Sequence, residues 1–292
     1  VTLDDLQERN LARTDPEMFF QIHKTPILID EVQYAPELFS YIKIAIDKGA
    51  KPGSFWLTGS QSYKLMHLAK ESLAGRIAVL NLTALSQNEL YANNLGDEAL
   101  LPFDISLESL AKREKGKESV DVVEIYNRVW KGGLPALASG KFTNKDIYYS
   151  SYLQTYLSRD VKEETQIKDD AKFIDFIRAV ACRIGQELNV HSIAVDVDVS
   201  DDTVKKWLGC LEKSEIIFYL HPYSNNLLKR VVKTPKLYFF DTGLVSYLTK
   251  YASPNILLNS SLNGAILENY IVAEIRKSYF NAGKEMFMYY YR

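Results

Sequence analysis

Two acidic residues follow directly on an apolar segment near the start of the chain. Pro26 is followed by Ile27-Leu28-Ile29, and this run ends in Asp30 and Glu31. A short aliphatic run of this kind is typical of a strand that is buried on both faces of a parallel sheet. In open α/β sheets the carboxyl ends of the strands face the ligand crevice. There, Asp30 could hold a hydrated Mg²⁺ and Glu31 could polarise a water; the alternative is a buried strand ending in two solvated acids.

A second apolar run ends in small polar residues. Phe55-Trp56-Leu57 leads into Thr58, Gly59 and Ser60. Residues 36–48, between the two runs, repeat apolar positions with helical spacing, so residues 26–60 predict a β-α-β unit with parallel strands. We therefore expect Thr58 and Ser60 to end the adjacent strand, where either could sense the terminal phosphate of a nucleotide.

Two further features affect the interpretation as a nucleotide site: Arg76 and the absence of a phosphate-binding loop. The acid pair resembles the Walker B pattern of P-loop nucleotidases. Arg76 is the candidate for contact with phosphate; the alternative is a surface or salt-bridged arginine at the start of a strand. The phosphate cradle Gly-x-x-x-x-Gly-Lys-Ser/Thr does not occur in the chain. We expect it upstream of Val1, on a strand next to residues 26–31. Its absence indicates either a truncated chain or an incorrect nucleotide hypothesis.

The composition narrows the classes of partner. Of the 292 residues, 47% are hydrophobic, and the net charge is −2, so a nucleic-acid site would have to be a local basic patch. No apolar run approaches the roughly 18 residues that span a bilayer, and no signal peptide is recognisable. The two cysteines, Cys182 and Cys210, do not form a metal or disulfide pattern. We expect a cytoplasmic protein without a membrane partner.

Residues 171–235 predict three helices followed by a two-stranded hairpin, which is the order of a winged helix. Its third helix begins at Ser200, a good N-cap. Four basic residues could neutralise DNA phosphates: Lys205 and Lys206 on that helix, and Lys229 and Arg230 in the hairpin turn. Four aspartates lie just before or at the start of the same helix and would repel a duplex: Asp196, Asp198, Asp201 and Asp202. The alternative is a winged helix that serves only as a packing module.

Several segments of the chain together match the motifs of one known family. In the first half they are Leu28-Ile29-Asp30-Glu31-Val32-Gln33-Tyr34, Tyr41-Ile42-Lys43 with Asp47, Leu57-Thr58-Gly59-Ser60-Gln61 and Ser72-Leu73-Ala74-Gly75-Arg76. In the second half they are Tyr156-Leu157-Ser158-Arg159-Asp160-Val161, Pro222-Tyr223-Ser224-Asn225-Asn226, Lys236-Leu237-Tyr238-Phe239-Phe240-Asp241-Thr242-Gly243-Leu244 and Gly264-Ala265-Ile266-Leu267-Glu268-Asn269-Tyr270-Ile271. Together these segments resemble the prokaryotic AAA-type ATPases that carry a C-terminal DUF4143 domain. The resemblance covers nearly the whole chain and is weakest at residues 92–120.

The resemblance implies an α/β fold with an incomplete P-loop-type parallel sheet, followed by helical, winged-helix and restriction-endonuclease-like parts. With it we expect an ATPase core without the P-loop at 1–92, a helical linker region at 93–168, a winged-helix-like domain at 169–240 and a truncated C-terminal α/β domain at 241–292. Both ends are expected to continue in a longer protein, since the chain starts with Val1 and stops in a tyrosine-rich run.

The resemblance also implies a function. ATP and Mg²⁺ would be the ligands, with Asp30 on the metal, Glu31 on the attacking water and Ser60 as the sensor. Turnover would be coupled to conformational change in the C-terminal domains, and assembly into a homo-oligomer is a further expectation. Glu268 and Glu274 lack the partner acids of a nuclease site, so they are interpreted as structural or solvated. The alternative is a non-enzymatic DNA-binding or regulatory protein with a degenerate ATPase domain.

Overall fold

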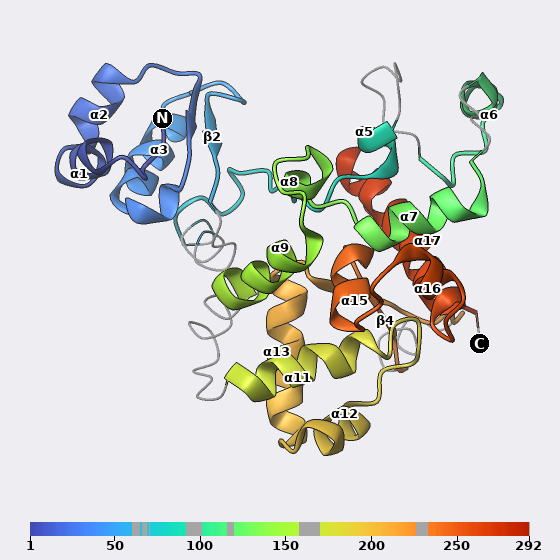
Figure 1. The fold of residues 1–292 in the computed structure, drawn as a ribbon. Helices are drawn as coiled ribbons and strands as arrows, with labels where there is room; N and C mark the ends of the chain where they lie inside the picture. The colour runs from blue at the N-terminus through green and yellow to red at the C-terminus, as the bar shows by residue number, and fades with distance from the viewer. Residues whose placement is uncertain are drawn as a thin grey trace. The chain divides into compact units, whose positions relative to one another are not determined.

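Two units make up the structure, a computed structural model, and each is considered by itself (Figure 1). The first comprises residues 1–79 and the second residues 80–292. The residues that the structure describes are 1–59, 65, 69, 71–91, 101–115, 120–157, 170–225 and 233–291.

The first unit contains the predicted β-α-β arrangement. After α1 (Leu6–Thr14) and α2 (Pro16–Ile22) come β1 (Ile27–Ile29), the short 3-10 turn η1 (Val32–Tyr34), α3 (Glu37–Asp47) and β2 (Phe55–Leu57). The two strands pair in parallel, with Ile27 opposite Phe55 and Ile29 opposite Leu57. This pairing confirms the parallel strands that the two apolar runs predicted. The helix α3 provides the crossover connection that a parallel pair requires.

The second edge of β1 is occupied by the first residues of the chain. The Asp30 N–H donates to the Val1 carbonyl at 2.9 Å, and the Leu3 N–H donates to the Asp30 carbonyl at 2.9 Å. Thr2 and Asp30 thereby form a parallel bridge. Both edges of β1 are paired, so the expectation of a further strand next to residues 26–31 is wrong. A further strand could pair only beside β2 or beside residues 1–3.

One face of this small sheet is covered and the other is open within the unit. Ile27 and Ile29 are buried in a cluster with Phe19 of α2 and with residues of α3, which include Phe39 and Ile42. Because side chains alternate along a strand, Leu28 and Trp56 point to the opposite face, where they are 51% and 53% exposed. The prediction of a strand buried on both faces is therefore wrong for these residues, since α1, α2 and α3 all pack on one side.

The second unit is mainly helical. Its helices are α5 (Gln87–Tyr91), α6 (Leu107–Lys115), α7 (Val122–Lys131), α8 (Pro135–Ala138), α9 (Lys145–Tyr152), α11 (Asp170–Ala181), α12 (Val190–Val197), α13 (Asp201–Lys213), α15 (Thr242–Leu248), α16 (Pro254–Leu258) and α17 (Asn263–Asn281), and a π-helical stretch η2 (Leu153–Leu157) continues α9. The strands β3 (Ile217–Leu220) and β4 (Lys236–Phe239) form an antiparallel pair. The Ser200 hydroxyl accepts from the Thr203 N–H at 3.1 Å, which confirms the predicted N-cap of α13.

Aromatic side chains hold α11 and α13 together. Phe173 and Phe176 lie against Trp207, with ring centroids 5.4 and 5.1 Å apart. Further along the chain, α17 packs on β4, where the Asn269 side chain exchanges two hydrogen bonds of 2.8 Å with the backbone of Phe239. The Asn269 amide thus makes the two backbone hydrogen bonds that a neighbouring strand would otherwise make with Phe239.

Two segments with strand-like sequence do not form strands. Residues 77–86 are neither helix nor strand, and several of their apolar side chains are exposed: Ile77, Val79, Leu80 and Leu82. At the carboxyl end, Tyr290 makes only an isolated bridge with Pro222. Residues 241–291 contain α15, α16 and α17 and no strand, so the predicted α/β character of this part is not seen in them. A segment forms a strand only where the edge of another strand can pair with it. The amino-acid composition of these segments does not show whether such an edge is available.

Candidate functional site

The carboxyl ends of β1 and β2 bring two predicted site residues together. The Thr58 hydroxyl donates to the Asp30 carboxylate at 2.5 Å. Backbone hydrogen bonds continue the pairing beyond the strands, from Thr58 N to Ile29 O at 3.0 Å and from Val32 N to Thr58 O at 3.1 Å. Asp30 and Thr58 are both half-buried, so each remains open to a ligand at this edge of the sheet.

Glu31, which directly follows Asp30 at this edge of the sheet, has an unusual backbone conformation. Its φ of 56° and ψ of 39° lie in the left-handed region, which a residue other than glycine adopts only when its surroundings impose it. Two neighbours fix the turn: the Tyr34 N–H donates to the Glu31 carbonyl at 3.0 Å, and Val32 is bonded to Thr58. The Gln33 amide donates to the Glu31 carboxylate. Glu31 is half-buried beside the Asp30–Thr58 pair.

The oxygen atoms at this edge fit part of a magnesium site. Mg²⁺ in nucleotide sites keeps several waters and takes only one or two protein ligands besides phosphate oxygens. Asp30 offers a carboxylate that Thr58 holds in place, which is the donor set such an ion requires. No group of three or more His, Cys, Asp or Glu residues suited to a metal occurs in the described part of the chain. The phosphate cradle is not supplied by the described residues.

Arg76 is not brought to this edge. Its guanidinium pairs with Asp47, with Nε 2.7 Å from one carboxylate oxygen and a terminal nitrogen 3.2 Å from the other. The hydrogen bond with Arg76 lowers the pKa of Asp47, and the same bond raises the pKa of Arg76. Asp47 ends α3, whose 11 residues run about 16 Å back from the carboxyl ends of the strands. Arg76 therefore lies toward the amino ends, away from Asp30 of its own chain.

Three other predicted residues cannot be placed. Ser60, Lys229 and Arg230 lie outside the described residues. Lys205 and Lys206 are exposed on α13. Lys205 lies 3.6 Å from the Asp202 carboxylate of the same helix, so its charge is partly met within the protein.

A buried aspartate that the sequence analysis did not select joins three segments of the second unit. Asp241 is 6% exposed and accepts hydrogen bonds from Gly133 N at 2.7 Å, Tyr149 Oη at 2.6 Å and Leu244 N at 2.7 Å. Burial raises the pKa of Tyr149, and the neighbouring Asp241 charge adds to the effect. Gly132 has a φ of 77°, and a Cβ there would meet both Asp241 oxygens and the Tyr149 hydroxyl at 2.6–2.8 Å. The cluster ties the end of α7 to α9 and α15.

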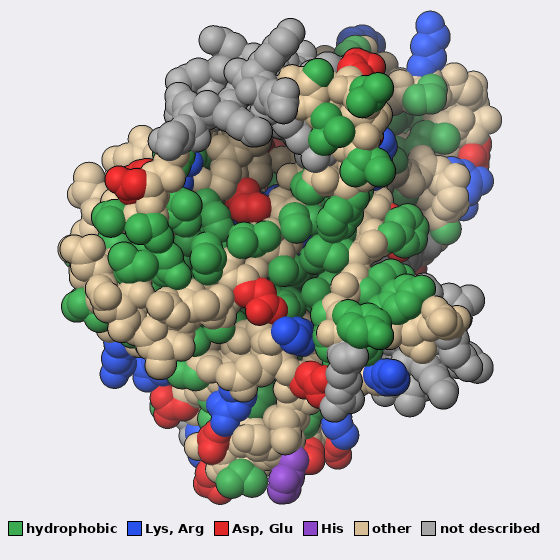
Figure 2. Space-filling view, turned by 90° about the vertical axis from the view of Figure 1, so that its right-hand side faces the viewer, with side chains coloured by type: hydrophobic (Ala, Val, Ile, Leu, Met, Phe, Trp, Pro, Cys, Tyr) green, Lys and Arg blue, Asp and Glu red, His purple; other side chains and the backbone are tan. Residues whose placement is uncertain are grey.

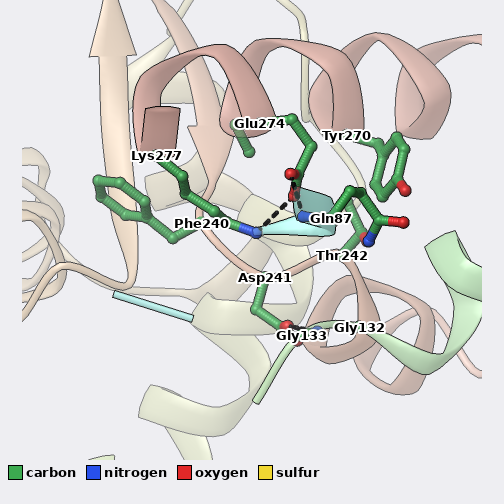
Figure 3. A pocket seen from close by; sticks show the side chains of 10 residues that line it. Gln87, Gly132, Gly133, Phe240, Asp241, Thr242, Tyr270, Glu274 and Lys277 are labelled. Atoms are coloured by element: carbon green, nitrogen blue, oxygen red, sulfur yellow. Dashed lines mark hydrogen bonds and ion pairs between the residues drawn. The ribbon is translucent and has the colours of Figure 1, made fainter. Parts of the chain in front are cut away.

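A small cavity beside this cluster is lined in part by an ion pair on α17, between Glu274 and Lys277 (Figure 3). Lys277 donates to Glu274 at 2.7 Å and to the Leu85 carbonyl at 3.2 Å, while Gln87 N donates to Glu274 at 2.6 Å. The cavity volume is ≈ 10 Å³, about the space of one water, so it does not admit a nucleotide. Glu274 therefore anchors residues 85–87 to α17.

Glu268 has a similar structural environment. It accepts from the Tyr238 hydroxyl at 2.6 Å and from Lys236 Nζ at 3.0 Å. These contacts tie α17 to β4. They agree with the interpretation of Glu268 and Glu274 as structural residues.

Lys145 is another buried ionisable group of this unit. It is 8% exposed, its amine donates to the Ser246 hydroxyl at 2.5 Å, and it lies 3.8 Å from the centroid of the Trp130 ring. Burial lowers the pKa of Lys145 to about 7, against the opposing effect of Asp241 and Asp146. Its surroundings thus disfavour the charged form that an unfolded chain would carry.

Lys145→Met should flatten the pH dependence of stability. The amine takes up a proton near its ordinary pKa of 10.5 when unfolded but only near 7 when folded, so the unfolded chain binds more protons between these values. Stability contributed by this residue therefore rises with pH over that window, by about 2 kcal/mol between pH 7 and 9. Urea titrations at both pH values measure it. Lys141→Met, at an exposed lysine, is the control; an unchanged pH dependence in Lys145→Met would contradict the prediction.

Comparisons with known proteins match both units. Residues 1–91 match the family model of an AAA domain, and residues 123–255 match a domain of unknown function, DUF8612. The second match replaces the DUF4143 domain that the sequence resemblance indicated. The described part of the chain contains no helix with the length and apolar character needed to cross a bilayer.

The curated relatives include uncharacterized proteins of Mycobacterium bovis and Mycobacterium tuberculosis. Each is 27% identical over 252 residues, which is 85% of this chain and 50% of the relative. The chain therefore spans about half the length of the curated relatives it matches. No solved structure matches the chain.

Proposed function

We propose that residues 1–79 carry the metal-and-water half of an ATP-hydrolysing site. The observation that supports this best is the Thr58–Asp30 hydrogen bond, which joins the ends of two parallel strands directly beside Glu31. The match of residues 1–91 to an AAA domain supports the same interpretation. Turnover of ATP by the full-length protein, compared with Glu31→Gln, tests it.

In this proposal each residue has one task. Asp30 holds the magnesium ion, and the Thr58 hydroxyl fixes the orientation of its carboxylate. The metal, when bound, neutralises charge on the phosphate oxygens. Glu31 accepts a proton from the water that attacks the γ-phosphate in line, and ADP leaves with the electron pair of the broken bond. Ser60 remains the proposed sensor. Turnover would change the conformation of the second unit, and a cytoplasmic location remains a prediction.

A catalytic role for Arg76 requires a second copy of the chain. Its pair with Asp47 lies toward the amino ends of the strands, so it does not reach a phosphate near Asp30 of its own chain. An arginine supplied by a neighbour can stabilise phosphoryl transfer. Mixing full-length Glu31→Gln with Arg76→Ala tests this role, because each would supply what the other lacks. If the mixture stays inactive, Arg76 does not act between copies.

The alternative function is DNA binding by residues 170–239, where α11, α12, α13, β3 and β4 follow in the order of a winged helix. The charges there argue against it. Residues 189–214 carry five acids and three lysines. Figure 2 shows basic and acidic side chains intermixed on the visible part of the end formed by α12. We therefore propose that these elements act as a packing module.

Duplex DNA should not be retarded by the full-length protein at about 150 mM salt. A DNA-binding face gains affinity from unpaired cations that replace counterions. Several cations of these elements already form salt bridges with acids of the same chain: Lys205 with Asp202, Lys172 with Asp198 and Arg183 with Asp196. Electrophoretic retardation at about 50 and 150 mM salt measures it. Binding that persists at the higher salt and is lost in Lys206→Glu would support the DNA-binding alternative.

A further inference from the structure

Gln33 is a buried side chain in contact with the proposed site. It is 8% exposed, and its Nε2 donates to the Glu31 carboxylate. The chemistry fixes which end of the amide faces Glu31, because the opposite orientation would set two acceptors against each other. Its other end, Oε1, is buried without a hydrogen-bond partner in the described structure. A buried acceptor left unpaired costs about 1–3 kcal/mol, so stability does not account for the amide at this position.

The backbone holds this amide from two sides. Gln33 lies in η1, where Tyr34 N bonds Glu31 O and Ala35 N bonds Val32 O, each at 3.0 Å. Across from it, a Cβ at position 59 would overlap the Gln33 amide oxygen. Gly59 therefore leaves just enough room for the amide at the end of β2. The Gln33 amide therefore lies between Gly59, at the end of β2, and the Glu31 carboxylate.

We propose that Gln33 is a positioning residue for the reaction, an inference that rests on the proposed function. Its amide donates to the Glu31 carboxylate and orients this group toward the attacking water. In the described residues the Gln33 amide donates to Glu31, whereas Asp30 is held by Thr58, so Gln33 substitutions should leave metal and nucleotide binding unchanged. Its effect is confined to the step in which the water loses its proton.

Two substitutions of similar size separate positioning from packing. In the full-length protein Gln33→Met removes the donor, and kcat should fall about 10- to 100-fold while the KM for ATP stays within about twofold. Gln33→Glu sets a second carboxylate against Glu31. Because like charges favour protonation of one partner, the acid limb of the pH–rate profile should move to higher pH. Gln21→Met, the same substitution at an exposed position of α2, should change neither quantity.

The outcomes distinguish this inference from the proposed function. If wild type hydrolyses ATP, Glu31→Gln abolishes turnover and Gln33→Met keeps the wild-type kcat, the positioning role is wrong and the proposed function stands. A lowered thermal stability with unchanged kcat and pH profile would show that Gln33 only packs. If Gln33→Met does not fold, the pH profile of Gln33→Glu decides, and an unshifted acid limb overturns the inference. Without wild-type turnover both proposals fail.

Discussion

Glu31→Gln in the full-length protein should lower magnesium-dependent ATP turnover by about 10²- to 10⁴-fold, the usual contribution of a general base. Glutamine keeps the size of the side chain but cannot accept a proton from the attacking water. Nucleotide affinity should stay near that of wild type, because Asp30 and Thr58 keep their hydrogen bond. Phosphate release at saturating ATP and titration with a fluorescent nucleotide measure the two quantities.

A matched control separates loss of the base from loss of charge. Glu37→Gln removes the same charge at an exposed position in the first turn of α3 and should retain turnover within about twofold. If both variants retain wild-type turnover, Glu31 is not the base. If Glu31→Gln also fails to bind nucleotide, the carboxylate is needed for binding, and its assignment to the water is wrong.

Asp241→Ala should lower the free energy of unfolding of the second unit by about 3–5 kcal/mol. The substitution leaves two buried donors without an acceptor, Gly133 N and Leu244 N. The Tyr149 hydroxyl keeps only the more distant Lys131 carbonyl, at 3.4 Å. Asp241→Asn should cost less, because its amide oxygen still serves two donors while its NH₂ faces the Gly133 N–H. Urea titration followed by tryptophan fluorescence measures this, since Trp130 and Trp207 both lie in this unit.

The control for this prediction is an aspartate with only surface contacts. Asp175 is exposed and pairs with Arg178 one helical turn away at 3.1 Å, so Asp175→Ala should change stability by less than about 1 kcal/mol. Equal effects of Asp175→Ala and Asp241→Ala would mean that the buried hydrogen bonds around Asp241 add little to stability. A large effect confined to Asp241→Ala would identify it as the residue that holds the end of α7 to α9 and α15.

Local features of the fold could be predicted from the sequence because neighbouring residues cause them. The helical spacing at residues 36–48 predicted α3, and its place between two apolar runs predicted parallel pairing. Ser200 was recognisable as an N-cap, and its hydroxyl accepts the hydrogen bond that this role requires. The approach of Thr58 to Asp30 followed from the same topology, since parallel strands end at one edge.

Other predictions were wrong or incomplete because they depended on distant partners. The sequence position of Arg76 was consistent with a phosphate-binding arginine. In the structure its guanidinium pairs instead with the carboxylate of Asp47, which lies 29 residues earlier in the chain. Tyr149 is fully buried and donates to Asp241, which lies 92 residues further along the chain, so helical spacing alone does not reveal its environment.

The sequence by itself determined the acid pair at Asp30 and Glu31, its position at a strand end and the parallel neighbour that places Thr58 beside it. Only the tertiary structure decided that both edges of β1 are paired, that Glu31 adopts a left-handed conformation and that Gln33 holds its carboxylate. The physical reason is the range of the interactions. Capping, strand ends and helical periodicity depend on residues a few positions apart, whereas a buried hydrogen bond depends on which distant donor the fold brings within about 3 Å.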